Sequence, residues 1–189
     1  MIQVRPSRQM RDLGVVQEGV PILAEPARAF GLPTEREAAE EAVEKLFTAM
    51  ERISQVHPFA KGMGLAAPQI GIGRAAAIVR PASADAPAIV LLNPRITDRS
   101  EETDEQFEGC LSFFDVRGSV PRPLRITVEA STLDGPVTTT TYERGIARLI
   151  HHEIDHLDGL LYTARMAADT EPIPVEQYQQ TGQAWSYER

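Results

Sequence analysis

The segment His152-Glu153-Ile154-Asp155-His156 constrains this chain more than any other. Successive residues of an α-helix are about 100° apart, so the imidazoles of His152 and His156 leave one face of a helix, one turn apart. They can occupy two corners of a tetrahedral metal site, with Glu153 beside the open corner. A metal ion lowers the pKa of water, and a neighbouring carboxylate can take the proton. The segment therefore predicts a helix with a hydrolytic metal centre rather than a charged face with two unrelated histidines.

The third ligand of this centre is expected upstream of the histidines. Proteases with an extended form of the motif carry a further histidine where this chain has Tyr162, and no histidine follows His156. Prolines interrupt the stretch that would have to form a later helix with a glutamate ligand. Cys110 is the only cysteine, so it forms no disulfide within the chain, and it follows Gly109, where the backbone can approach another group closely. A thiolate and two imidazoles leave one position open, which is typical of a catalytic site.

A third stretch contains small residues and ends in a glutamine: Gly62-Met63-Gly64-Leu65-Ala66-Ala67-Pro68-Gln69. Its tight backbone could lie against a substrate, and no lysine-serine or lysine-threonine pair follows it, which disfavours a phosphate-binding loop. Together with Glu108-Gly109-Cys110-Leu111-Ser112 and the histidine segment, it resembles the peptide deformylase family. That family carries Gly-x-Gly-Leu-Ala-Ala-x-Gln, Glu-Gly-Cys-Leu-Ser and His-Glu-x-x-Asp-His-Leu in this order.

The resemblance implies that Cys110, His152 and His156 bind one divalent metal ion. Glu153 would act first as general base and then as general acid. The family favours Fe²⁺, whereas the donor set would also suit Zn²⁺, Ni²⁺ or Co²⁺.

The resemblance also implies how the substrate is held. The side-chain amide of Gln69 and the backbone N–H of Leu111 would form an oxyanion hole, and the backbone at Gly64 and Gly109 would pair with an extended substrate. The expected reaction removes the N-terminal formyl group from formylmethionyl peptides, such as nascent proteins, and releases formate.

Three alternatives stay open at this point. The first is a deformylase of a small formylated metabolite, whose chemical residues would be the same. The second is a non-catalytic metal-binding domain, against which Glu153 argues because a structural site does not need an added base. The third is a general endopeptidase, which Tyr162 disfavours because it stands where a ligand would be required.

Three positions depart from the family pattern. His151 stands where a glutamine is usual, and as a helical neighbour of His152 it is expected to point about 100° away from the metal. Phe113 and Phe114 replace a branched aliphatic residue and a proline. Arg148 stands where some members have an apolar pocket residue, and its stem is expected to line the pocket with the guanidinium outside. These departures affect the shape of the pocket rather than the chemistry.

Composition indicates a single soluble domain over residues 1–189. The chain is 42% hydrophobic and 24% charged, with no apolar run that approaches a membrane span. Residues 1–14 contain three arginines without an apolar signal core, so we expect a cytoplasmic protein. The net charge of −8 argues against direct nucleic-acid binding, so any contact with a ribosome would be local and transient.

The expected fold class is α+β, with antiparallel β-sheets packed around a central helix that carries the histidines. A capping box at Thr34 would begin an N-terminal amphipathic helix that ends near Ile53. Residues 124–132 and 136–142 alternate around Asp134-Gly135 as in a β-hairpin. The histidine helix is expected over 144–157, and the tail after Tyr162 is expected to be extended and to add an edge strand.

Overall fold

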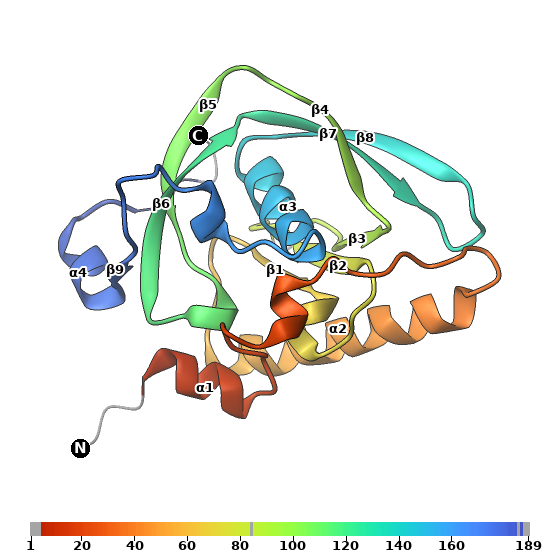
Figure 1. Ribbon diagram of the computed structural model, residues 1–189, viewed down its shortest axis with the longest axis horizontal. Coiled ribbons are helices and arrows are strands. Elements are labelled where there is room, and N and C mark those ends of the chain that lie inside the picture. Colours follow the sequence, from red (N-terminus) through yellow and green to blue (C-terminus); the bar gives the residue numbers. More distant parts are fainter. Residues whose placement is uncertain (1–4, 84, 185, 187–189) are drawn as a thin grey trace.

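The computed structural model describes residues 5–83, 85–184 and 186, and it combines a few helices with short strands (Figure 1). The helices are α1 (Pro6–Asp12), α2 (Arg36–Val56), α3 (Arg144–Leu157) and α4 (Val175–Gln180), with short 3-10 turns η1 (Pro21–Ala24), η2 (Ala67–Ile70), η3 (Leu111–Phe113) and η4 (Tyr162–Arg165). No helix of the described part is long and apolar enough to cross a membrane.

The strands form three small sheets within the described residues, in the orders β1-β2-β3, β4-β7-β8 and β5-β6-β9. Every strand pair is antiparallel, which confirms the predicted α+β class with antiparallel sheets. The strands are β1 (Met63–Ala66), β2 (Ala76–Arg80), β3 (Ile89–Leu92), β4 (Arg95–Arg99), β5 (Thr103–Glu108), β6 (Val116–Pro123), β7 (Arg125–Ser131), β8 (Val137–Glu143) and β9 (Ile173–Pro174).

Helix α3 lies in the middle of the fold, with strands of all three sheets around it (Figure 1). Its apolar residues recur at helical spacing and pack against β2 and β7, where Val79 and Ile126 are fully buried. Gly159 lies two residues after the end of α3 and has φ +75°. A Cβ at this position would lie 2.8 Å from the backbone of Glu25. Glycine is therefore required where the chain leaves α3 and passes close to this backbone.

Helix α2 packs its buried face against β1 and β2 in a second apolar cluster, which includes Leu46, Met50 and Ile78. The predicted capping box at Thr34 is wrong, because the N-cap residue is Glu35 and no side chain caps the helix. The carboxylate of Glu35 instead accepts hydrogen bonds from the Gly31 N–H and the Arg74 guanidinium.

The predicted hairpin is confirmed, since β7 and β8 pair from Arg125↔Glu143 to Ser131↔Val137. Gly135 in its turn has φ +105°, a conformation that favours glycine. The tail adds the short strand β9 beside β6, but α4 follows it, so the expectation of a wholly extended tail is wrong. Tyr178 of α4 packs on Phe107 with ring centroids 5.2 Å apart, which holds this turn of helix on the sheet. Residues 185 and 187–189 lie outside the described part.

Candidate active site

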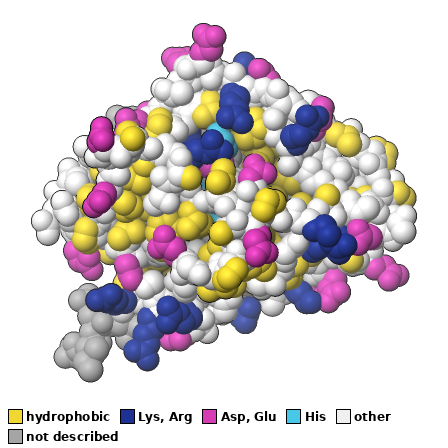
Figure 2. All heavy atoms as spheres, viewed as in Figure 1, with side chains coloured by type: hydrophobic (Ala, Val, Ile, Leu, Met, Phe, Trp, Pro, Cys, Tyr) yellow, Lys and Arg dark blue, Asp and Glu magenta, His cyan; other side chains and the backbone are white. Residues whose placement is uncertain are grey.

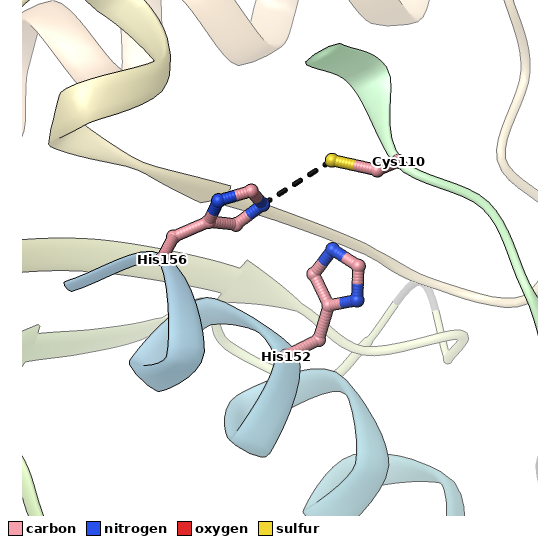
Figure 3. Close-up of side chains that lie close together, drawn as sticks. All are labelled: Cys110, His152 and His156. Carbon is pink, nitrogen blue, oxygen red and sulfur yellow. Dashed lines mark hydrogen bonds between the residues drawn. The ribbon is translucent and has the colours of Figure 1, made fainter. Parts of the chain in front are cut away.

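Two histidines of α3 and the cysteine after β5 meet beside β1 (Figure 3). The Sγ of Cys110 lies 3.3 Å from Nε2 of His156, and the potential ligand atoms of Cys110, His152 and His156 all lie within 4.8 Å of one another. Cys110 and His156 are almost fully buried, and His152 is mostly buried. One sulfur and two nitrogens that converge in this way fit a metal such as zinc or iron with three protein ligands.

Glu153 lies next to this cluster and packs on the backbone of β1 at Gly64. Any Cβ added to Gly64 would collide with the Glu153 carboxylate, so the close approach requires glycine. Glu153 is 3% exposed, and its Oε2 has no hydrogen-bond partner among the described residues. Burial raises the pKa of Glu153 to about 7, although the nearby charge of His152 opposes this rise. A carboxyl group with such a pKa can both accept and return a proton near neutral pH.

Gln69 in η2 turns its amide toward the same point. Its Oε1 accepts a hydrogen bond from the Ala66 N–H at 3.0 Å, which directs the Nε2 amide toward Cys110 Sγ at 3.6 Å and Ser112 Oγ at 3.3 Å. Leu111 follows Cys110 directly and begins η3, so its backbone N–H belongs to the same turn. The amide groups expected to bind an oxyanion thus lie next to the candidate ligand cysteine.

A cavity of about 240 Å³ contains most of the residues that the sequence predicts for catalysis, substrate binding and metal binding. All of them except His156 line it, and His156 adjoins it through Cys110; the lining members are Gly64, Gln69, Gly109, Cys110, Leu111, His152 and Glu153. Strand β1 is at the edge of its sheet, so one side of its backbone is free of strand partners in the described structure. Such an edge can accept an extended peptide as an added strand.

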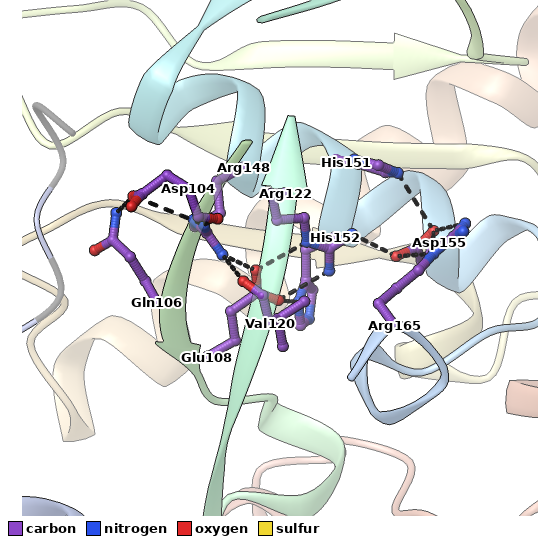
Figure 4. Close-up of polar contacts among 10 residues, drawn as sticks. All are labelled: Asp104, Gln106, Glu108, Val120, Arg122, Arg148, His151, His152, Asp155 and Arg165. Atoms are coloured by element: carbon purple, nitrogen blue, oxygen red, sulfur yellow. Dashed lines mark hydrogen bonds and ion pairs between the residues drawn. The ribbon is translucent and has the colours of Figure 1, made fainter. Parts of the chain in front are cut away.

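A buried network of charges lies behind His152 (Figure 4). The Nδ1 of His152 is 3.0 Å from Oε2 of Glu108, and Arg122 bonds Glu108 through Nε and Nη2, both at 2.9 Å. The Nη1 of Arg122 also donates to Asp155 at 2.6 Å. Burial alone would raise the pKa of Glu108, but the charge of Arg122 holds that pKa well below its usual range. The ionised Glu108 can therefore orient His152 with Nε2 toward the cluster.

Sequence reasoning missed Arg122 entirely and the role of Glu108. Glu108 belongs to the cysteine motif, so its position was a usable signal, whereas nothing in the sequence around Arg122 distinguishes it from a surface arginine. Arg122 is only 1% exposed, since β6 places it between Glu108 of β5 and Asp155 of α3.

The expectation for Arg148 is wrong, because its guanidinium is buried instead of outside. Its Nη1 donates to Glu108 at 2.7 Å and to the Val120 carbonyl at 2.9 Å, and its Nη2 donates to the Asp104 carbonyl at 2.6 Å. These acceptors on β5 and β6 replace the water that the guanidinium would otherwise bind. Arg148 still lines the cavity, so one wall of the side-chain pocket is more polar than expected.

His151 and the two phenylalanines are also placed by the structure. His151 is not part of the ligand cluster, and it borders a separate cavity of about 120 Å³ beside Asp155. Phe113 stacks on Tyr162 with centroids 4.7 Å apart, away from the main cavity, whereas Phe114 lines that cavity. Of the two phenylalanines, only Phe114 can therefore affect the shape of the substrate pocket directly.

Replacing Arg122 by methionine is expected to destabilise the fold strongly. The change leaves Glu108 and Asp155 buried with fewer counter-charges, which typically costs about 3–5 kcal/mol. The free energy of unfolding from urea titration measures this. Arg95→Met is the matched control, because the Arg95–Glu129 pair is mostly exposed and its loss is expected to have a small effect. Equal stability losses in the two variants would contradict the structural role of Arg122.

The chain is similar to known proteins over most of its length. The sequence model described as polypeptide deformylase matches residues 13–171. A peptide deformylase of Acidobacterium capsulatum is 38% identical over 157 residues, which cover 82% of this chain and 86% of that protein. Peptide deformylase 1 of Nitrosomonas europaea is 35% identical over 162 residues, covering 80% and 86%. The class I type b peptide deformylase of Acinetobacter baumannii, solved with actinonin bound, superposes with a TM-score of 0.70 at 29% identity, covering 81% of this chain and 97% of that one.

Proposed function

The chain belongs to the polypeptide deformylase family, and on this premise we propose how its residues divide the work of the reaction. It is a hydrolase that removes the N-terminal formyl group from nascent peptides. The observation that carries the division of roles is the convergence of Cys110, His152 and His156 beside the buried carboxyl of Glu153. The family match does not favour the small-metabolite alternative or a non-catalytic metal domain.

Cys110, His152 and His156 would hold one divalent ion, for which we propose Fe²⁺. The support is the donor set, its burial and the second hydrogen bond of His152 to Glu108, which is common for metal-binding histidines. When bound, the ion polarises the formyl carbonyl and makes a water molecule more acidic. Helix α3 would then be the metal-bearing helix at the centre of the fold. The amphipathic helix α2 packs on β1 and β2, which α3 also contacts.

Glu153 would move the proton in the reaction. It takes a proton from the attacking water, whose oxygen bonds to the formyl carbon, and it delivers the proton to the nitrogen as the carbon–nitrogen bond breaks. Formate and a free amino terminus result. The Gln69 amide and the Leu111 N–H would stabilise the negative charge on the former carbonyl oxygen. The direction of the Gln69 amide toward Cys110 supports this role.

The substrate would enter as an extended chain along the free edge of β1. Its backbone would pair with Gly64 and Gly109, with the methionine side chain in the cavity beside α3. We further propose that residues 1–189 act as one domain in the cytoplasm, on chains that leave the ribosome, with only local and transient ribosome contact. The net charge of −8 supports the absence of direct nucleic-acid binding.

Formyl-methionyl peptides are expected to be hydrolysed much faster than the same peptides with an acetyl group. The extra methyl has to fit where Gly64 and Glu153 already touch, so we expect kcat/KM to fall by about 10–100-fold or more. A coupled formate or amine assay on matched peptides measures both. Small formamides serve as the comparison for the metabolite alternative. Equal rates on formyl and acetyl peptides would exclude the proposed selectivity, and cleavage of internal peptide bonds would indicate a protease.

A further inference from the structure

The C-terminal part of the chain supplies one wall of the active-site cavity. Tyr178 of α4 lines this cavity, and every other described lining residue comes from α3 or from earlier in the chain. The family match ends at residue 171, so α4 lies beyond it. No step of the proposed reaction uses Tyr178, although its side chain borders the space where the substrate would lie.

Helix α4 is anchored to the sheet at both of its ends. At its start, the Val175 N–H donates to the Asp115 carbonyl at 2.9 Å, directly after β9 pairs with β6. Beyond its end, the Ser186 N–H donates to Oε1 of Gln106 at 2.7 Å, and the amide of Gln106 donates to the Ser186 carbonyl at 3.1 Å. An isolated helix of six residues would not be stable, so these bonds hold Tyr178 at the cavity.

Tyr178 lies on the face of β5 that points away from α3. The Glu108 side chain points toward α3, where it contacts His152. Side chains alternate along a strand, so the neighbouring residues Phe107 and Gly109 face the other way. Phe107 and Tyr178 meet on that face, with ring centroids 5.2 Å apart. Figure 1 shows α4 and α3 on either side of β6, the strand that pairs with β5, and Figure 2 shows the same view with all atoms.

The same alternation assigns one substrate residue to this face. With the reactive end at Cys110 and the peptide backbone beside Gly109, the substrate leaves along β5 toward Phe107, which lies about 7 Å beyond Gly109. The methionine side chain would occupy the cavity beside α3. The side chain of the second residue would therefore point away from α3, toward Phe107 and Tyr178, and that of the third residue would point back.

We propose that Phe107 and Tyr178 form an aromatic subsite that favours a large apolar side chain, above all phenylalanine, at the second residue of the substrate. The inference rests on the proposed function and adds a substrate class to it. Both rings are only half-buried, so an apolar side chain can cover surface that water would otherwise contact. This contact is remote from the formyl carbon and is the same before and during the reaction, so the preference should reside in KM.

The test compares amidated formyl-Met-Phe-Ala-Ala, formyl-Met-Ala-Ala-Ala and formyl-Met-Ala-Phe-Ala. We expect phenylalanine at the second residue to raise kcat/KM by roughly 5–10-fold over alanine, chiefly through a lower KM. Phenylalanine at the third residue should give a clearly smaller gain, because its side chain points the other way. An equal gain at both positions would indicate a general attraction for apolar peptides and would overturn the subsite.

Substitutions on α4 connect the preference to the ring of Tyr178. Tyr178→Ala should bring the phenylalanine-to-alanine ratio at the second residue close to one, whereas Tyr178→Phe, which keeps the ring, should preserve this ratio. Gln179→Ala is the matched control, since Gln179 is exposed on the same helix outside the cavity lining. Ratios within one variant cancel any loss of folded enzyme.

The outcomes separate the subsite from the proposed function. Equal kcat/KM for the two second-residue peptides in the unaltered enzyme, or an unchanged ratio in Tyr178→Ala, would overturn the subsite, and so would an equal loss in Gln179→Ala. Turnover of formyl-Met-Ala-Ala-Ala upholds the proposed function in each of these cases. Failure of every formyl peptide would overturn both.

Discussion

Alanine in place of Cys110, His152 or His156 is expected to remove the metal and the activity together. Three protein donors converge at the cluster among the residues that the structure describes, so each variant leaves two of them. Loss of a group that merely supports a ligand commonly costs about 10–100-fold in metal affinity or activity, and loss of a ligand itself should exceed this. Metal analysis by mass spectrometry and kcat/KM on a formyl-methionyl peptide, both measured on the same anaerobic sample, test the prediction.

His151→Gln is the matched control for the histidine variants. His151 is buried in the same helix and adjoins His152 in sequence, but it lies outside the ligand cluster. This variant should retain close to one metal ion per chain and most of the activity. If Cys110→Ala retained its metal, Cys110 would no longer be a candidate ligand. If His151→Gln lost the metal as fully as His152→Ala, general damage to α3 would explain both.

Local patterns in the sequence were sufficient to predict much of this fold. The β7–β8 hairpin depends on alternating residues and on Asp134-Gly135, all within a short stretch, and the structure confirms it. The α+β class with antiparallel sheets follows from several such stretches together. A short-range signal also explains the wrong prediction for the start of α2. Thr34 fits a capping pattern, but Glu35 is the N-cap residue, and its carboxylate bonds to Gly31 and Arg74.

Interactions between distant segments could not be predicted in the same way. Arg148 is expected to keep its charge in water, because a lone helical arginine normally does. The acceptors that allow its burial lie on β5 and β6, which are distant from Arg148 in the sequence. They become its neighbours only in the folded chain. The same applies to Arg122, whose partners Glu108 and Asp155 lie on different elements. Charge type is visible in a sequence, whereas the pairing that permits burial is not.

The candidate site could be predicted only in part from local patterns. Its residues come from three separated motifs, and no local rule indicates that Gln69 and Cys110 should meet; the family resemblance supplied that expectation. The structure places Gln69 Nε2 3.6 Å from Cys110 Sγ. Arg148 makes one wall of the cavity polar, so substitutions at this residue can test how the wall affects substrate preference.

Glu153→Gln should separate metal binding from proton transfer. The amide has nearly the same shape as the carboxyl group and should leave the three ligands in place, but it cannot accept the proton of the attacking water. We expect kcat to fall by about 10²–10⁴-fold, the usual contribution of a positioned general base, with KM changed much less. Steady-state kinetics and metal content on one preparation give both quantities.

Stability provides the independent readout for this variant. Glu153 is almost fully buried and its Oε2 has no partner among the described residues, so a neutral amide avoids the desolvation of a carboxylate. The free energy of unfolding should therefore stay equal or rise while turnover falls, which a variant that merely damages the fold would not do. Near-normal turnover with the metal bound would show that another group moves the proton. Loss of the metal would instead make Glu153 part of the ligand set, and the division of roles between Glu153 and the histidines would have to be redrawn.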